Sequence, residues 1–475
     1  MGAPSPTPLV PAGTSTPRTS SARARAELLF VALGALAGAL SQSLLIPVLS
    51  QLTNQYGAGA DWLLTSTLLV AAVAVPVFGR LADMFGKRLM LLIALAGLVA
   101  GSVITATTSE LGLLILGRAI QGLGLAGIPL GISLLTALLP PERAGSAVAL
   151  VSAMLGIGGA LGLPLAGVVV QSWNFHALFW ILAAAGLVAF IGIIVVVPEA
   201  PGRSGGRFDM AGGLLLSAAL VALLLPLAEA SDWGWGSPRV LSLLAVAGVL
   251  FVVLGAVELR LKQPLVDVRA LSRRPIVMTN IVSVIYGFAV FGSFLSTAPF
   301  VQAPRETGYG FGASVITAGL VLLPNGLAQL ILAPLSARLI ARIGAPVTLA
   351  IGSLLVVVGY LLRFPLSGSL LQVTICTTVI GAGVGIGFAS MPALINTHTP
   401  RDELAAANGL NSLFRNIGGS LGSAISASLL ALITIDVAGR AVANLDAYRL
   451  LIGVVAAASA VAAVIALCIP RRPVS

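Results

Sequence analysis

The densest polar feature of the sequence is a ten-residue stretch, 79–88, that lies between two long apolar runs. Its six notable residues are Gly79, Arg80, Asp83, Gly86, Lys87 and Arg88. Three cations and one anion are costly to place in hydrocarbon, so we expect a tight polar turn at a membrane surface. The first glycine would let a neighbouring helix approach closely, and the second would let the backbone reverse with positive φ.

The anion of this stretch suggests a contact that could be made and broken. Asp83 can pair with a nearby cation or with the N-terminus of a helix, whose dipole favours a negative charge. Short loops rich in Lys and Arg remain on the cytoplasmic side of a membrane. We therefore predict that this loop is a cytoplasmic gate held by Asp83.

Two arginines lie inside long apolar runs, where a charge needs a cavity or a partner. Arg118 is several residues into its run, and Arg415 is about 11 residues into its own, which is roughly 16 Å along a helix. Neither has an acidic partner within a run. Either each guanidinium bonds carbonyls freed at helix bends, or both face a cavity. In the second case the cavity is net positive, prefers anionic or neutral substrates, and is lined also by neutral groups: Gln42, Gln121 and Gln329.

A glycine-proline pattern marks the run at 145–170. Its residues of interest are Gly158, Gly162, Pro164 and Gly167. Such a row lets one helix lie close against another, and the proline removes a backbone hydrogen bond and can bend the helix. We expect this face to meet a helix of the opposite half of the molecule and to open or seal a gate, although tight packing alone would explain the same pattern.

The residue types give little support to catalysis, and we predict that the chain is not an enzyme. The two histidines, His176 and His398, lie near the ends of runs, and the two cysteines, Cys376 and Cys468, lie inside runs. No nucleophile, zinc-protease or phosphate-loop motif is present. The sequence predicts no cofactor, no metal site and no disulfide.

Composition places the chain in a membrane. Apolar residues make up 58% and charged residues 9% of the 475, whereas soluble domains carry about 25% charge. The net charge of +10 has no basic cluster with interleaved aromatics behind it, so we expect no nucleic-acid partner. Arginine outnumbers lysine by 24 to 2 alongside many alanines and glycines, which suggests a GC-rich bacterium and its cell membrane.

Apolar runs of about 20 residues recur along the chain, each long enough to span a bilayer as a helix. They predict an all-α membrane protein with fourteen spans: 27–50, 61–82, 88–108, 110–136, 145–170, 175–197, 209–228, 239–258, 275–299, 312–337, 345–364, 367–396, 404–435 and 447–468. Residues 1–26, rich in Pro, Ser, Thr and Ala, are expected to be a disordered cytoplasmic N-terminus. With 79–88 inside, both termini are cytoplasmic, and 19 of the 26 Lys and Arg residues fall inside.

The sequence contains an internal repeat. A shift of 260 aligns residues 140–162 with 400–422 without a gap, and nine of the 23 positions are identical. The 79–88 stretch has a fainter echo at 338–344, without an acidic residue. We therefore predict a six-helix bundle at 27–200, two inserted helices with linkers at 201–270, and a second six-helix bundle with a short cytoplasmic tail at 271–475. The inserted helices are expected to face lipid, away from the cavity.

These motifs resemble the major facilitator superfamily, and the fourteen spans resemble its drug:proton antiporter branch. The pattern G-x-L-x-D-x-x-G-K-R at 79–88 is similar to the family's signature loop. Residues 116–124 are similar to its helix 4 motif, whose arginine faces the central cavity, and 158–167 to its antiporter motif. The stretch 415–419 resembles one late in that branch. The resemblance implies two parallel six-helix halves, and a role for Asp83 in the gate.

One departure concerns the proton route. The branch usually carries an aspartate in helix 1, where this sequence has Ser41 followed by Gln42, and we find no Asp or Glu deep in any span.

We expect a secondary transporter that exports a small organic molecule, such as a drug, antibiotic or metabolite, by alternating access coupled to protons. Its partners would be that substrate, protons and the lipid bilayer, and it would act as a monomer. The alternative is a metabolite facilitator or importer on the same fold without proton exchange; an interaction or assembly protein is a third possibility.

Overall fold

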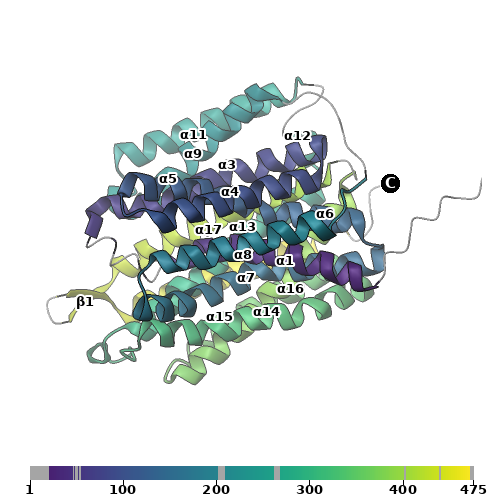
Figure 1. Cartoon of the computed structure of the whole chain (residues 1–475). Helices are drawn as coiled ribbons and strands as arrows, with labels where there is room; N and C mark the ends of the chain where they lie inside the picture. The colour runs from purple at the N-terminus through teal and green to yellow at the C-terminus, as the bar shows by residue number, and fades with distance from the viewer. Residues whose placement is uncertain are drawn as a thin grey trace, which may run out of the picture.

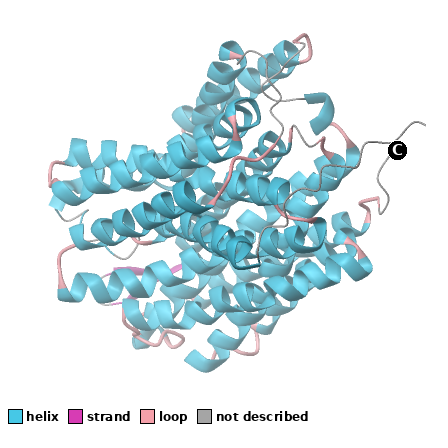
Figure 2. Ribbon diagram, turned by 45° about the vertical axis from the view of Figure 1, so that its right-hand side comes forward, coloured by secondary structure: helices cyan, strands magenta, loops and turns pink. Residues whose placement is uncertain are grey.

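The computed structural model describes residues 21–45, 48, 52, 55–201, 209–261, 268–400, 403–437 and 440–470. Long helices that run alternately in opposite directions make up nearly all of it (Figures 1 and 2). Each of the fourteen predicted spans overlaps one helix or, for 110–136, a continuous helical run. The first helix ends at Ser43, and residues 46–47 and 49–50 of the predicted span 27–50 lie outside the described residues.

The first half contains α1 (Ser21–Ser43), η2 (Gly57–Asp61), α3 (Trp62–Phe85), α4 (Lys87–Thr107), α5 (Leu111–Gln121), η3 (Gly122–Ala126), α6 (Gly127–Leu138), α7 (Pro141–Ser172) and α8 (His176–Val196). The segments α5, η3 and α6 form one run with a tightened middle. The insert contains α9 (Met210–Ala228), α10 (Ala230–Trp233) and α11 (Pro238–Glu258).

The second half contains α12 (Val268–Leu271), α13 (Arg274–Gln302), η4 (Arg305–Thr307), α14 (Val315–Ile343), α15 (Ala345–Leu362), α16 (Leu370–His398), α17 (Leu404–Leu432), β1 (Thr434–Val437), β2 (Arg440–Ala443) and α18 (Leu445–Leu467). Side chains before several helices cap them, as expected for Ser, Asp and Asn. Ser314 accepts from the backbone N–H of Thr317, and Ser369 from that of Gln372.

Among the described residues, twelve helices are long and apolar enough to cross a membrane. A thirteenth is α7, which bends by 42° between Arg143–Gly159 and Pro164–Val170, next to the proline expected to bend it. The remaining long helix, α17, carries several asparagines and serines and a buried arginine, so its mean hydropathy is lower.

Two bundles form the body of the protein. Buried apolar side chains of α1 and α3–α8 make one core, and those of α13, α15, α16 and α18 make a second. The bundles meet along two seams, α3 with α17 and α7 with α14. Because the repeat relates α7 to α17 and α3 to α14, the two seams are equivalent positions in the two halves.

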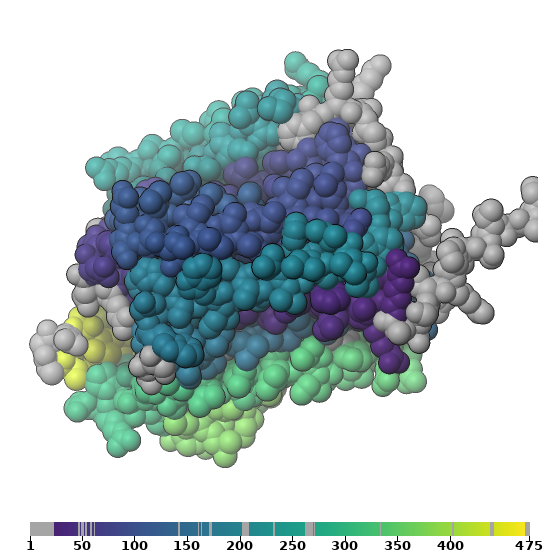
Figure 3. Space-filling model, viewed as in Figure 1, coloured from purple at the N-terminus to yellow at the C-terminus, as the bar shows by residue number. Residues whose placement is uncertain are grey.

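The inserted helices lie along one edge of the molecule (Figure 3). Leu216, Leu220 and Leu224 of α9 pack against Leu410 and Leu413 of α17, together with Ala72 of α3, so α9 covers one seam. The outer helix, α11, packs on α9, and its apolar side chains are largely exposed. That exposure is what a lipid-facing helix requires.

Three expectations need correction. Helix α1 already begins at Ser21, so 21–26 are helical, because Arg23 and Glu27 pair one turn apart at 3.3 Å; residues 1–20 lie outside the described residues. The chain is not entirely α-helical, since β1 and β2 form an antiparallel hairpin, with Ile435 opposite Val442, where the thirteenth span was expected to end. Finally, 79–85 are not a loop but the last turns of α3.

Candidate functional site

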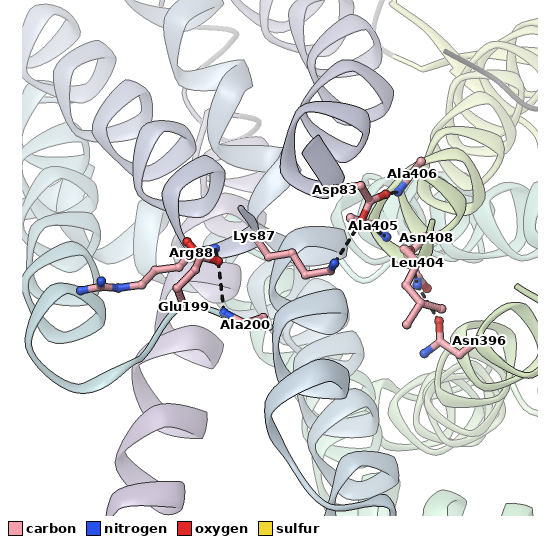
Figure 4. Close-up of polar contacts among 10 residues, drawn as sticks. All are labelled: Asp83, Lys87, Arg88, Glu199, Ala200, Asn396, Leu404, Ala405, Ala406 and Asn408. Carbon is pink, nitrogen blue, oxygen red and sulfur yellow. Dashed lines mark hydrogen bonds and ion pairs between the residues drawn. The ribbon is translucent and has the colours of Figure 1, made fainter. Parts of the chain in front are cut away.

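A buried aspartate at the end of α3 joins the two bundles. Asp83 Oδ1 accepts a hydrogen bond from the backbone N–H of Ala405 at 3.2 Å, and its Oδ2 accepts one from Ala406 at 2.8 Å (Figure 4). Lys87 Nζ lies 3.1 Å from Asp83 Oδ1. Both kinds of partner considered for this aspartate, a cation and a helix N-terminus, are therefore present. We call these contacts the Asp83 clamp, and the end of the molecule that contains them the Asp83 end.

The clamp is buried. The exposed fraction is 0% for Asp83 and 2% for Lys87. A buried carboxylate needs its lone pairs satisfied, and here two backbone donors and one ammonium do so at the positive end of the α17 dipole. Gly79 makes this approach possible, because a Cβ there would lie 2.8 Å from the carbonyl oxygen of Ala405.

The other end of the same motif binds within its own bundle. Gly86 separates α3 from α4 with φ 124°, which glycine adopts readily, and a Cβ there would lie 2.6 Å from Glu199 Oε2. Glu199 Oε1 accepts from the backbone N–H of Arg88 at 3.0 Å, and the Arg88 guanidinium donates to the carbonyl of Ile194 at 2.6 Å. The motif therefore consists of the end of α3 and the start of α4 on either side of Gly86. Asp83 contacts the second bundle, and Arg88 contacts the first. Arg80 of the same motif is half-buried.

A second polar contact joins the bundles at the Asp83 end, and sequence reasoning missed it. Asn396 Nδ2 donates to Thr136 Oγ1 at 3.4 Å, while Asn408 Nδ2 donates to Asn396 Oδ1 at 2.6 Å (Figure 4 draws the asparagine pair). Thr136 and Asn396 are 260 residues apart, which is the shift of the internal repeat. The contact therefore joins equivalent positions of the two halves, where the pseudo-twofold axis passes between them.

The glycine-proline helix has two faces with different neighbours. Gly158 and Gly162 face α1 of the same bundle, and Ser43 Oγ donates to the carbonyl of Gly158 at 2.8 Å. Pro164 and Gly167 face α14 of the other bundle. The expectation that Gly158 and Gly162 meet the opposite half is therefore wrong, because they lie on the other side of the helix from Pro164 and Gly167.

A cavity of about 380 Å³ lies in the half of the molecule away from the Asp83 end. It opens between α3 and α17, at the same seam that the clamp holds. Its lining residues are Gln42, Leu64, Thr65, Leu68, Ala228, Glu229, Phe291, Leu295, Asn416, Ser420, Ser423, Ala424 and Ala427. Gln42, which the sequence predicted to line a cavity, is one of these lining residues.

Arg118 is 1% exposed and is not among these lining residues. Its Nε donates to the carbonyl of Leu63 at 2.9 Å, and its Nη1 donates to the carbonyl of Ser41 at 2.8 Å and to Gln121 Oε1 at 2.6 Å. Arg118 and Gln121 thus join α5 to α1 and α3 inside one bundle. This geometry matches the alternative in which the guanidinium bonds backbone carbonyls.

Arg415 also lies outside the described lining. It is 5% exposed, donates to Ser412 Oγ at 3.0 Å, and stacks 4.9 Å from the ring centre of Phe388. Gln329, another suggested cavity residue, packs against Gly156 in the α7–α14 seam. The described lining of the cavity contains no Lys, Arg or His, so the expectation of a net-positive cavity does not describe this one.

The charged residue of the lining is Glu229, which the sequence reading overlooked. It follows Ala228, where α9 ends, and Thr65 Oγ1 donates to its Oε1 at 3.3 Å. The expectation that both inserted helices stay away from the cavity is therefore wrong for the end of α9. The available signal was an acid one residue beyond the predicted span 209–228, but its neighbour on α3 could not be read from the chain.

Comparison with curated proteins finds relatives among exporters. The tetracenomycin C resistance and export protein of Streptomyces glaucescens is 27% identical over 430 residues, covering 89% of this chain and 79% of the relative. Multidrug resistance protein 3 of Bacillus subtilis is 25% identical over 412 residues, covering 84% and 79%.

The fold has a solved counterpart. The human organic anion transporter MFSD10 (TETRAN) superposes with a TM-score of 0.66 over 93% of this chain and 99% of its own, at 16% identity, so the likeness concerns the fold. The family model of the Major Facilitator Superfamily matches residues 31–310 and 303–475. With its apolar helices in two repeated bundles, the chain belongs to the Major Facilitator Superfamily and is a multi-pass membrane transport protein.

Proposed function

We propose that this protein exports a small organic molecule across the cell membrane by alternating access, in exchange for protons. The observation that carries the proposal is the contrast between the two ends of the α3–α17 seam. One end is closed by the Asp83 clamp and the Thr136–Asn396 contact, and the other contains the cavity. A site that is accessible from one side while the other side is sealed is what alternating access requires.

The proposed topology has fourteen spans and cytoplasmic termini. The bent α7 and the polar α17 complete the count, because the polar side chains of α17 face the interior: Asn408 and Asn411 are 2% and 1% exposed. The positively charged loops then lie inside. The Asp83 end becomes the cytoplasmic gate, the cavity faces outward, and the protein acts as a monomer.

Export is favoured over import by the relatives, which are named for resistance and export. Those names describe the relatives, and we extend efflux of drugs, antibiotics or metabolites to this chain as a proposal. Proton antiport follows the branch that the sequence resembles. The alternative, a facilitator without proton exchange, is favoured by Ser41, which stands at the acidic position of helix 1 and whose hydroxyl donates to the Gly38 carbonyl at 2.7 Å.

Transport by purified protein in liposomes tests the proposal. With the vesicle interior acidified, we expect accumulation of an exported dye at several times the level seen without a pH gradient. Uptake that stops at equal concentrations on the two sides, and that a collapsed gradient leaves unchanged, would support the facilitator. Absence of uptake for all of a panel of cationic, neutral and anionic dyes would contradict export of small organic molecules.

A further inference from the structure

We infer that Glu229, at the end of the inserted helix α9, selects organic cations at the cavity between α3 and α17. The inference rests on the proposed export function, whose substrate class it names. It assigns the inserted helices a part in recognition, which their position at the edge of the molecule does not suggest.

The position of Glu229 follows from the way α9 lies across the seam. Asp209 caps the start of α9 by accepting from the backbone N–H of Gly212 at 2.9 Å. Leucines one turn apart then follow the α3–α17 seam, and the helix ends at Ala228. The next residue, Glu229, therefore lies in the cavity lining, where Thr65 Oγ1 of α3 donates to its Oε1 at 3.3 Å.

Glu229 is the charged residue of the described cavity lining. The described lining residues from α1, α3, α13 and α17 are all neutral. Three buried arginines have partners outside the cavity lining. Arg118 bonds the carbonyls of Leu63 and Ser41 inside the first bundle. In the second bundle Arg415 stacks on Phe388, and Arg363 donates to Ser296 and Thr297. Asp83 and Arg80 lie at the opposite end of α3. An anion in a partly desolvated cleft attracts cations more strongly than it would in water.

The remaining lining describes the body of the ligand. Apolar side chains of the lining are Phe291, Leu295, Leu64 and Leu68, and Phe291 supplies an aromatic face that can contact a cation. Asn416, Ser420 and Ser423 line the α17 side with neutral hydrogen-bonding groups. A volume of about 380 Å³ is within the range of small-molecule sites. The chemistry fits a compact apolar or aromatic cation.

Tetraphenylphosphonium and tetraphenylborate test the charge alone, because they are nearly identical in shape and opposite in sign. Equilibrium binding of each to the purified full chain in detergent would be measured for the wild type and for Glu229→Gln. We expect the variant to weaken phosphonium binding at least tenfold while borate binding stays the same or tightens. The change in the ratio of the two Kd values is the readout, since partition into micelles cancels between variants.

Three further variants make the result specific. Glu110→Gln removes an exposed carboxylate at the same end of the first bundle and should leave both Kd values unchanged. Thr65→Val removes the hydrogen bond but keeps the charge, so phosphonium binding should change by less than threefold. Glu229→Asp keeps the charge and should keep the preference, which protects the test if Glu229→Gln folds poorly.

A ratio that Glu229→Gln leaves within twofold of the wild type overturns the inference, as does a wild type that does not bind phosphonium. The export proposal is judged separately, by liposome transport of both ions. Binding with the expected ratio but without transport of either ion would refute export while supporting the cation site. Transport of both ions at rates that Glu229→Gln leaves unchanged would support export and refute the cation site.

Discussion

The two seams between the bundles occupy equivalent positions in the internal repeat, yet different forces hold them. In the α7–α14 seam, close packing runs the length of both helices. Gly145 faces Ala337 near the Asp83 end, Gly156 faces Gln329 in the middle, and Gly167 faces Ile316 beyond the bend. A Cβ at Gly319 would lie 2.7 Å from both the ring and the backbone nitrogen of Pro164.

The α3–α17 seam is instead held at one end. Gly79 and Gly409 bring the helices together near the clamp, where Asp83 accepts from two backbone amides. Towards the other end, residues of the same two helices line the cavity. The partial repeat of the 79–88 motif at 338–344, at the end of α14, also places a glycine between two helices. That residue, Gly344, has φ 84°, but the repeat contains no acidic residue.

This difference indicates which seam opens. The few hydrogen bonds that the Asp83 carboxylate accepts from α17 can be broken without separating much apolar surface, and they can be remade because their geometry is directional. Interdigitated glycine packing loses many dispersion contacts at once when it is pulled apart. We therefore expect α3 and α17 to part at the Asp83 end during transport, with α7 and α14 acting as the hinge.

Of the substitutions considered, one that breaks the Asp83 clamp should reduce the transport rate most. Asp83→Asn keeps the shape of the side chain but leaves the buried Lys87 without its counter-ion and weakens the contact to α17. Removing one partner of a buried pair costs about 3–5 kcal/mol. We expect transport in everted vesicles to fall below about a tenth of the wild-type rate, with membrane insertion retained.

Stability and gating are separated by a second variant. In Asp83→Asn/Lys87→Gln no charge is left unpaired, so the thermal stability should return towards the wild type. The link to the α17 N-terminus stays weakened, and transport should stay low. Wild-type transport in Asp83→Asn would refute the clamp, and recovery in the double variant would reduce its role to stability.

The hinge seam can be tested by overpacking. Gly319→Val places a branched side chain against Pro164, where neither ring nor backbone can move aside, and overpacking costs about 1–3 kcal/mol. We expect the melting temperature and the transport rate both to fall, transport by about tenfold. Gly255→Val in α11 is the matched control, since nothing lies within 4 Å of a Cβ at that position. Equal losses in both variants would show that the effect is not specific to the seam.

The sequence predicts the elements well because a helix that spans a bilayer must be apolar over its own length. The repeat and the role of Asp83 could be predicted because each depends on residue types within short stretches of the sequence. The faces of α7 were not, since assigning Gly158 to α1 and Pro164 to α14 needs the neighbours of each face. Arg118 bonds carbonyls, which leave no signature in side-chain identity. Glu229 lies in the cavity only because α9 crosses the seam.

Loss of the Thr136–Asn396 contact on the pseudo-twofold axis should reduce the transport rate least. Asn396 makes neutral hydrogen bonds to Thr136 and Asn408, and such bonds between membrane helices average about 0.6 kcal/mol. Asn396→Ala removes two such bonds and should therefore change the transport rate by less than about eightfold. Thr136→Val removes one of them and should change it by less than about threefold.

A double-mutant cycle relates this contact to the clamp. If both hold the Asp83 end shut, the two substitutions are coupled, and Asn396→Ala should have little further effect once Asp83→Asn has weakened the closure. Strictly additive losses would mean that the asparagine acts independently of the clamp. A loss from Asn396→Ala as large as that from Asp83→Asn would contradict the comparison itself, because closure would then depend on the contact that both halves share and not on the charge that only one of them carries.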